Sequence, residues 1–290
     1  MNWLLYAFIA AAIFGFQDII SKIVLSKEHS NEFLSILYLS GLIFLLPFFK
    51  QIIVPDATSM LLIMIRSITL AGAYMLFIKA LKHMDISEVS PLTNLRLLII
   101  FLYGFVFLSE SIRWMQILGA FVLMFGSYIL ESEGHIKELH KTLIKITKNK
   151  YVFYLVIYII LMPMTSVFSK MIFNRGVNSF NLLFFHYVIS TFIYLGITFL
   201  VYGGIKDLVE GFKLGGAWIF VRSVSGLIVV FISFLAYADP VSLVSVIVPI
   251  TQLRTLISTI FGGALFHEKH LSSKIIGCVL MVIGVGFIIL

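Results

Sequence analysis

Long apolar stretches follow one another along almost the whole of this chain of 290 residues. Each has about 18 to 25 residues, enough for a helix to cross about 30 Å of hydrocarbon. Continuous apolar runs are typical of membrane helices, whereas barrel strands show alternation. The pattern predicts an all-α integral membrane protein with ten transmembrane helices. Their expected bounds are 3–25, 32–50, 60–82, 87–108, 113–131, 151–173, 180–202, 214–237, 241–265 and 271–290.

The composition agrees with this interpretation, because 60% of the residues are hydrophobic and only 12% are charged. A soluble globular protein of this length needs more polar surface. The net charge of +7 comes largely from loops, so we expect the basic residues to meet membrane lipids and not nucleic acid. The histidines are scattered, and the sequence contains no zinc-protease motif or glycine-rich phosphate loop. We therefore expect no metal site, no cofactor and no enzyme activity.

The expected helices divide into two groups of five around the only extended polar segment of the sequence, residues 132–150. Because each group has an odd number of spans, the second enters the membrane with the opposite orientation to the first. The sequence thus predicts two inverted five-helix repeats, residues 1–131 and 151–290, joined by a polar linker. Many secondary transporters have this plan, with the ligand site near the middle of the membrane between the repeats.

A duplicated motif supports the division into repeats. The run Pro91-Leu-Thr-Asn-Leu-Arg96 recurs as Pro249-Ile-Thr-Gln-Leu-Arg254, and a glutamate follows each arginine fourteen residues later. Asn94 therefore corresponds to Gln252. The other matched positions are Glu110 with Glu268, Gly119 with Gly277, and Gly126 with Gly284.

Short motifs accompany these matches in a fixed order along the chain. Through them and their duplication, the chain resembles the EamA type of the drug/metabolite transporter superfamily over essentially its whole length, although Phe14 stands where that family usually has tryptophan. The resemblance implies a ten-helix transporter of small metabolites, often an exporter driven by proton or solute exchange. The motifs are Gly15-Phe-Gln-Asp-Ile-Ile-Ser-Lys22, Ala80-Leu81, Leu108-Ser-Glu110, and Leu118-Gly119 through Gly126.

Two arginines lie near the centres of their expected spans, where a charge is costly and is often kept for function. For Arg96 the sequence offers Asp18 as a partner, because both should lie at a similar depth. In the second half the corresponding stretch, residues 165–169, contains no acidic residue. We therefore expect the planar guanidinium of Arg254 to bind an anionic group of the cargo. The expected substrate-binding residues are Arg254, Gln252, Asn94 and Arg96.

Each of these roles has a structural alternative. Both arginines could donate to backbone carbonyls that Pro91 and Pro249 leave without amide partners, and so only fix the packing of the helices. Asp18 is a candidate proton-coupling group, because burial and a nearby cation shift its pKa in opposite directions. The alternative for Asp18 is a static pair with Arg96 or with Lys22, which lies four residues away on the same helical face.

Four further charges lie nearer the ends of their spans. Successive helices run antiparallel, so the start of the third helix and the end of the fourth share a membrane face. We therefore expect two symmetry-related structural ion pairs, Arg66 with Glu110 and Arg222 with Glu268. The same geometry would also serve an ion-controlled gate at the mouth of a cavity. Lys170, close to the end of the sixth helix, is expected to reach the lipid headgroups, with the lining of a cavity as the alternative.

These features favour a secondary transporter, an exporter or exchanger, that works by alternating access at a midplane cavity. The central arginines suggest an anionic or zwitterionic metabolite such as an amino acid or organic acid, with protons as a candidate coupling ion. The alternatives are a flippase for a phosphorylated lipid carrier and a membrane-embedded enzyme. We expect a monomer or homodimer in the cytoplasmic (inner) membrane. The distribution of loop lysines and arginines favours termini outside the cytoplasm, whereas the resemblance implies that both are cytoplasmic.

Overall fold

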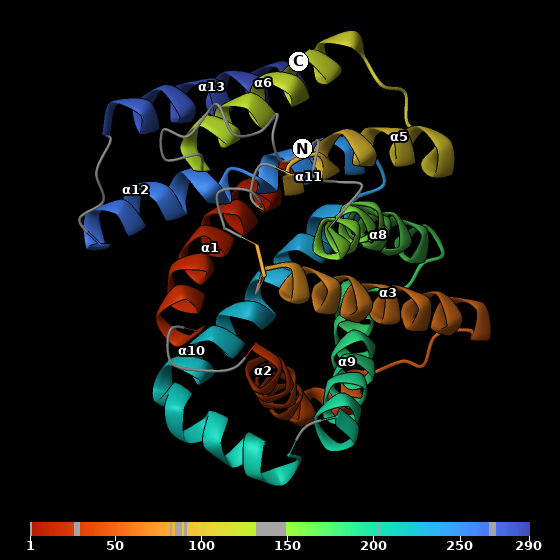
Figure 1. The fold of residues 1–290 in the computed structure, drawn as a ribbon. Helices are drawn as coiled ribbons and strands as arrows, with labels where there is room; N and C mark the ends of the chain where they lie inside the picture. Colours follow the sequence, from red (N-terminus) through yellow and green to blue (C-terminus); the bar gives the residue numbers. More distant parts are fainter. Residues whose placement is uncertain are drawn as a thin grey trace. The chain divides into compact units, whose positions relative to one another are not determined.

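Every regular element in the described part of the chain is a helix, which confirms the predicted all-α class (Figure 1). Seven helical segments are long and apolar enough to cross a membrane, and three shorter apolar helices of 10–17 residues accompany them. The predicted count of ten spans stays a prediction, and residues 132–148 of the linker lie outside the described residues. The structure, a computed structural model, describes residues 2–25, 30–81, 83–84, 89, 92–131, 149–201, 203–266 and 271–290.

The helices follow the predicted spans closely in most of the chain. Those of the first half are α1 (Asn2–Leu25), α2 (Ser30–Leu45), the 3₁₀-helix η1 (Leu46–Gln51), α3 (Ala57–Leu81), α5 (Arg96–Leu108) and α6 (Trp114–Glu131). Those of the second half are α8 (Lys150–Asn174), α9 (Ser179–Val201), α10 (Ile205–Ala238), α11 (Val244–Thr251), α12 (Arg254–Phe266) and α13 (Leu271–Ile289).

The chain folds into two compact units, and each unit takes helices from both predicted repeats. Unit 1 consists of Met1–Ala71 and Phe168–Pro240, and it contains α1, α2, α9 and α10. Unit 2 consists of Gly72–Val167 and Val241–Leu290, and it contains α5, α6 and α11 to α13. The boundaries fall inside α3 and α8, so these two helices contribute residues to both units.

In unit 1, α10 packs against α1, α2 and α9 (Figure 1). Ala7 and Ala10 of α1 are fully buried, and side chains this small allow two membrane helices to approach closely. Between α2 and α9, the ring of Tyr38 lies 5.3 Å from that of Tyr187 and 5.0 Å from that of Tyr194. Small side chains and closely packed aromatic rings therefore contribute to the interior of this unit.

In unit 2, α6 and α13 lie side by side with their backbones in contact (Figure 1). A Cβ atom on Gly119 would lie 2.5 Å from the carbonyl oxygen of Gly284, and one on Gly126 would lie 2.8 Å from that of Gly277. Only glycine fits such an approach. Because Gly119 corresponds to Gly277 and Gly126 to Gly284, the two contacts occupy equivalent positions of the two sequence halves.

The span predicted over residues 241–265 is helical, with a local change of geometry between α11 and α12. The helix tightens at Gln252 and Leu253, whose amides bond to the carbonyls of Pro249 and Ile250, three residues back, at 3.0 Å. In the same turn the Thr251 hydroxyl donates to the carbonyl of Val248 at 2.7 Å, and Pro249, which has no backbone amide, lies inside α11.

The fourth span, predicted over residues 87–108, tightens at the equivalent point. The amide of Leu95 bonds to the carbonyl of Leu92 at 3.1 Å, and that of Leu97 bonds to the carbonyl of Asn94 at 2.9 Å. α5 consequently begins only at Arg96. A stretch of 3₁₀ bonding inside a helix often marks a hinge, and here the stretch coincides with the duplicated motif.

Candidate functional site

Each central arginine of the sequence prediction is the first residue of a helix. Arg96 begins α5 and Arg254 begins α12, directly after the two tightened turns. The first amides of both helices bond back into these turns, as those of Leu97 and Thr255 do to the carbonyls of Asn94 and Gln252. Each turn therefore places a guanidinium at the point where 3₁₀ bonding gives way to α-helical bonding.

The structure joins three of the four predicted substrate-binding residues in one chain of hydrogen bonds within unit 2. Arg96 Nη2 donates to Gln252 Oε1 at 2.6 Å, and Gln252 Nε2 donates to Asn94 Oδ1 at 2.9 Å. Asn94 Nδ2 donates in turn to Ser127 Oγ at 3.1 Å, and Arg96 Nη1 donates to Tyr158 OH at 3.2 Å. We call this set of five residues the arginine–amide chain.

The amides of the arginine–amide chain are buried, whereas Arg96 is partly buried. The side chains of Asn94 and Gln252 are 1% and 3% exposed, and buried amides of this kind need hydrogen-bond partners. The Nε atom of Arg96 is buried and has no hydrogen-bond partner among the described residues. A guanidinium with a donor left over has the chemistry to bind a carboxylate or phosphate oxygen.

The fourth predicted residue, Arg254, is partly buried and follows Gln252 by two residues. Its placement at the start of α12 matches that of Arg96 at the start of α5. Its role in binding stays a prediction.

Glu110 holds the start of α11 within unit 2. Its Oε1 and Oε2 accept hydrogen bonds from the amides of Val244 at 2.6 Å and Ser245 at 3.0 Å. Negative charge at a helix N-terminus is stabilising, because the first amides lack partners in the helix. Gly104 makes room for this carboxylate, since a Cβ there would lie 2.6 Å from Glu110 Oε2. The sequence did not indicate this capping role.

Arg66 lies in a separate buried cluster in unit 1. Its Nε donates to Ser169 Oγ at 2.7 Å, and its Cζ lies 4.9 Å from the centre of the Phe234 ring. The side chain is only 7% exposed, and Nη1 has no hydrogen-bond partner among the described residues. Next to it in sequence, Ser67 Oγ lies 3.2 Å from His186 Nδ1.

The structure gives the positions of some of the residues predicted to form ion pairs or to couple protons, but it does not test these roles. Asp18 lies in α1 and Arg66 in α3, both in unit 1, whereas Glu110 lies in unit 2. The pairs Arg66 with Glu110 and Asp18 with Arg96 therefore stay predictions. Glu268 lies outside the described residues, so the pair with Arg222 also stays a prediction.

The expectation for Lys170 is wrong. Its side chain is 5% exposed, and Nζ donates to the carbonyls of Tyr237 at 3.2 Å and Asp239 at 2.7 Å. These carbonyls lie at the C-terminus of α10, where the last carbonyls lack helical partners and favour a cation. The lysine therefore caps a helix inside unit 1 and does not reach the lipid headgroups.

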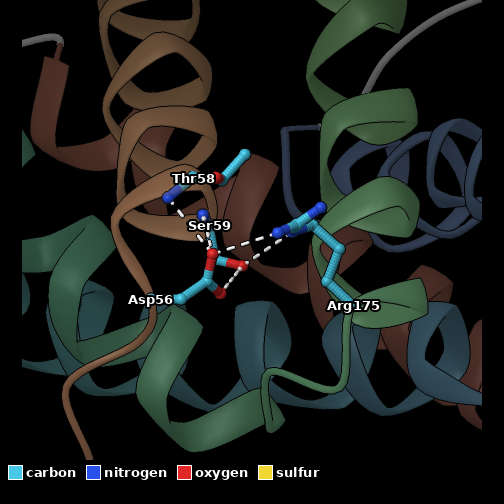
Figure 2. A network of polar contacts seen from close by, with 4 residues as sticks. All are labelled: Asp56, Thr58, Ser59 and Arg175. Atoms are coloured by element: carbon cyan, nitrogen blue, oxygen red, sulfur yellow. Dashed lines mark hydrogen bonds and ion pairs between the residues drawn. The ribbon is translucent and has the colours of Figure 1, made fainter.

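A second polar network, which we call the loop clasp, ties two loops of unit 1 together (Figure 2). Asp56 Oδ2 accepts from Arg175 Nη2 at 3.0 Å and from the amide of Thr58 at 3.1 Å, and Asp56 Oδ1 accepts from Ser59 Oγ at 2.5 Å. Arg175 Nε also donates to Ser59 Oγ at 3.0 Å. The hydroxyl of Ser59, together with Arg175, holds the pKa of the exposed Asp56 carboxyl at about 2.

The loop clasp was not predicted from the sequence, although the pattern of Asp56 and Ser59 was recognisable in it. Asp56 precedes α3 and stands three residues before Ser59, which is the arrangement of an N-cap residue. The partner Arg175 lies 119 residues further along the chain, and no local pattern points to it. Among the residues that the structure describes, no group of three or more His, Cys, Asp or Glu side chains is placed to hold a metal ion.

Comparison with known proteins gives a family and a fold. The sequence model of the EamA-like transporter family matches residues 1–131 and 149–290. Among curated protein sequences, no significant match was found. A solved structure, titled only as the crystal structure of a protein, has a TM-score of 0.76 to this chain at 13% sequence identity. The similarity covers 100% of this chain and 99% of that chain, so the fold is shared throughout.

Proposed function

Because the chain belongs to the EamA-like transporter family and is a multi-pass membrane transporter of small molecules, we propose that its cargo is an anionic or zwitterionic metabolite, such as an amino acid or organic acid. It acts as a secondary transporter, an exporter or exchanger of the cytoplasmic membrane. Ten spans in two inverted five-helix repeats alternate access to a midplane cavity. Support for ten spans comes from the three shorter apolar helices, which lie at predicted positions beside the seven longer ones.

The observation that carries this proposal is the pair of tightened turns that end in Arg96 and Arg254. Interrupted helices whose N-termini point at an anionic group of the substrate recur in secondary transporters. In this protein the helical geometry changes directly before a guanidinium at the start of α5 and again at the start of α12. The buried Nε of Arg96, which has no hydrogen-bond partner among the described residues, supplies a donor for the anion.

We assign the binding of the anionic group to Arg254 and Arg96, with Gln252 and Asn94 as the neutral groups that orient them. Asp18, a carboxylate within the first span, is the candidate proton-coupling group. A carboxylate of this kind can exchange a proton when its surroundings change between two conformations of the protein.

The proposal is tested by comparing metabolites inside and outside cells that express the wild-type chain, the Arg254→Gln variant or no copy. We expect the wild type to change the distribution of a small set of anionic or zwitterionic solutes, and Arg254→Gln to reduce that effect at least about tenfold, because a charge-assisted hydrogen bond is lost. Arg175→Gln, in the loop clasp, is the charge-matched control and should retain the effect. Full activity of Arg254→Gln would contradict the assignment.

A further inference from the structure

Unit 1 contains a buried cation, Arg66 of α3, and the side chains that contact it are neutral. The arginine side chain is only 7% exposed. Its Nε donates to Ser169 Oγ at 2.7 Å, and its Cζ lies 4.9 Å from the centre of the Phe234 ring. Its Nη1 atom is also buried, and it has no hydrogen-bond partner among the described residues. A hydroxyl and an aromatic ring therefore hold the guanidinium without balancing its charge.

Among the described residues, the titratable groups near Arg66 do not supply the missing negative charge. Those that interact with it electrostatically are Tyr38, Tyr237 and His186. A phenol loses its proton only at about pH 10, and an imidazole is neutral or cationic at neutral pH. No carboxylate of the described residues forms an ion pair with Arg66. Glu110, its predicted partner, lies in unit 2, where both of its oxygens accept hydrogen bonds from the start of α11.

An unbalanced charge at this position is costly. Arg66 lies within the apolar segment Ala57–Ala80, which is long enough to cross the membrane. Ionised side chains in membrane spans are expensive and are usually paired. Arginine stays protonated in proteins, so it cannot avoid this cost by releasing its proton. An anion at Nη1 would balance the charge and would also give the buried donor a partner.

We propose that Arg66 binds a small monovalent anion inside unit 1, held by the N–H groups of Nη1. The other buried cation of the described part of this unit, Lys170, is already held by two carbonyls at the C-terminus of α10. A single guanidinium balances one negative charge, whereas a second negative charge would be buried without a partner. This chemistry fits a halide ion or the carboxylate of a small organic acid. The site is independent of the proposed function, because Arg96 and Arg254 belong to unit 2.

A bound anion would stabilise the folded protein. Arg66 lies on α3, and its two neutral contacts come from α8 and α10, so the anion neutralises a charge at the point where these three helices meet. A ligand that binds only the folded state raises the free energy of unfolding as its concentration rises. Thermal stability should therefore depend on small anions through Arg66.

The test measures thermal unfolding of the full-length protein in detergent while chloride or formate replaces the bulkier gluconate at constant ionic strength. Once the anion exceeds its Kd, the Tm of the wild type should rise by about 3 °C for each tenfold increase in concentration. Arg66→Met removes the charge but keeps an unbranched side chain, and it should lose this rise. The variant should fold, because apolar replacement of buried charges is often neutral or stabilising. Arg175→Met, in the loop clasp of the same unit, is the matched control and should keep the rise.

The two salts distinguish the source of the anion. A rise with chloride alone would identify a resident halide ion, and a rise with formate alone would identify the carboxylate of an organic solute. Either result supports the site. Equal responses of the wild type and Arg66→Met, or no response in either, would overturn it. An ion pair of Arg66 with Glu110, or a water molecule on Nη1, would give that result.

Two further variants keep the outcome decisive. Arg66→Lys retains the charge but loses the forked donors, so the anion concentration that gives half of the Tm shift should increase at least about fivefold. If Arg66→Met does not fold, an unchanged concentration in Arg66→Lys would overturn the site. Arg254→Gln should retain the rise. A rise that disappears in Arg254→Gln and persists in Arg66→Met would place the anion at Arg254, which would support the proposed function and refute the site at Arg66.

Discussion

At the scale of single residues, a polar atom in the membrane interior needs a hydrogen-bond partner within the protein. The duplicated motif singled out Asn94, Arg96 and Gln252, and the structure joins them in one chain of hydrogen bonds, while their role in binding stays a prediction. Ser127 and Tyr158 are also part of that chain of hydrogen bonds, but no feature of the sequence predicted their participation. Hydroxyl residues are common in this protein, which has 12 tyrosines, so nothing local distinguishes the two that were used.

The loop clasp gives a prediction about pH. Hydrogen bonds from Ser59 and Arg175 lower the pKa of Asp56 from 3.8 to about 2. A carboxyl whose folded pKa is lowered contributes stability above its unfolded pKa and loses that contribution as the pH falls through the folded value. Thermal unfolding of the wild type and Asp56→Asn should therefore differ above about pH 4 and converge near pH 2. The difference should be small, since the carboxylate is 53% exposed and screened by solvent. A difference that grows towards low pH would contradict this role.

At the scale of elements, periodicity and apolar length predicted where nearly all helices lie. The tightened turns could not be predicted from hydropathy, because hydropathy reports the apolar length of a span and not the pattern of backbone hydrogen bonds within it. The early start of α10 was missed for another reason. Its first turns carry the charged residues Lys206, Asp207 and Glu210, a composition that is typical of a loop between membrane spans. A kink at Gly216, whose φ is 51°, separates these turns from the apolar span.

The contact between α6 and α13 gives a stability prediction at this scale. In Gly284→Ala the new Cβ would lie 2.6 Å from the amide nitrogen of Leu123 and 2.7 Å from the carbonyl oxygen of Gly119. We expect a loss of about 1–3 kcal/mol, measured by thermal unfolding in detergent. Gly286→Ala in the same helix is the matched control, because nothing lies within 4 Å of its Cβ. Its effect should be neutral or stabilising by up to about 1 kcal/mol. Equal losses in both variants would contradict the close contact.

At the scale of the whole molecule, the two sequence repeats do not coincide with the two compact units. The family match covers residues 1–131 and 149–290, in agreement with the two halves seen in the sequence. The compact units instead combine helices from both halves. Motif duplication reveals the first kind of organisation, but only tertiary contacts reveal the second. The arginine–amide chain follows from this mixing, because it links residues of α5 and α8 with Gln252 beside α11.

The central claim, that the arginine at the start of α12 binds the anionic group of the cargo, is tested most directly by selectivity in proteoliposomes. Counterflow would compare a transported carboxylate metabolite with its primary amide, in the wild type and in Arg254→Gln. We expect the wild type to prefer the carboxylate at least about tenfold, and Arg254→Gln to lose that preference, because only the anion gains from the guanidinium. An unchanged preference in Arg254→Gln would contradict the account.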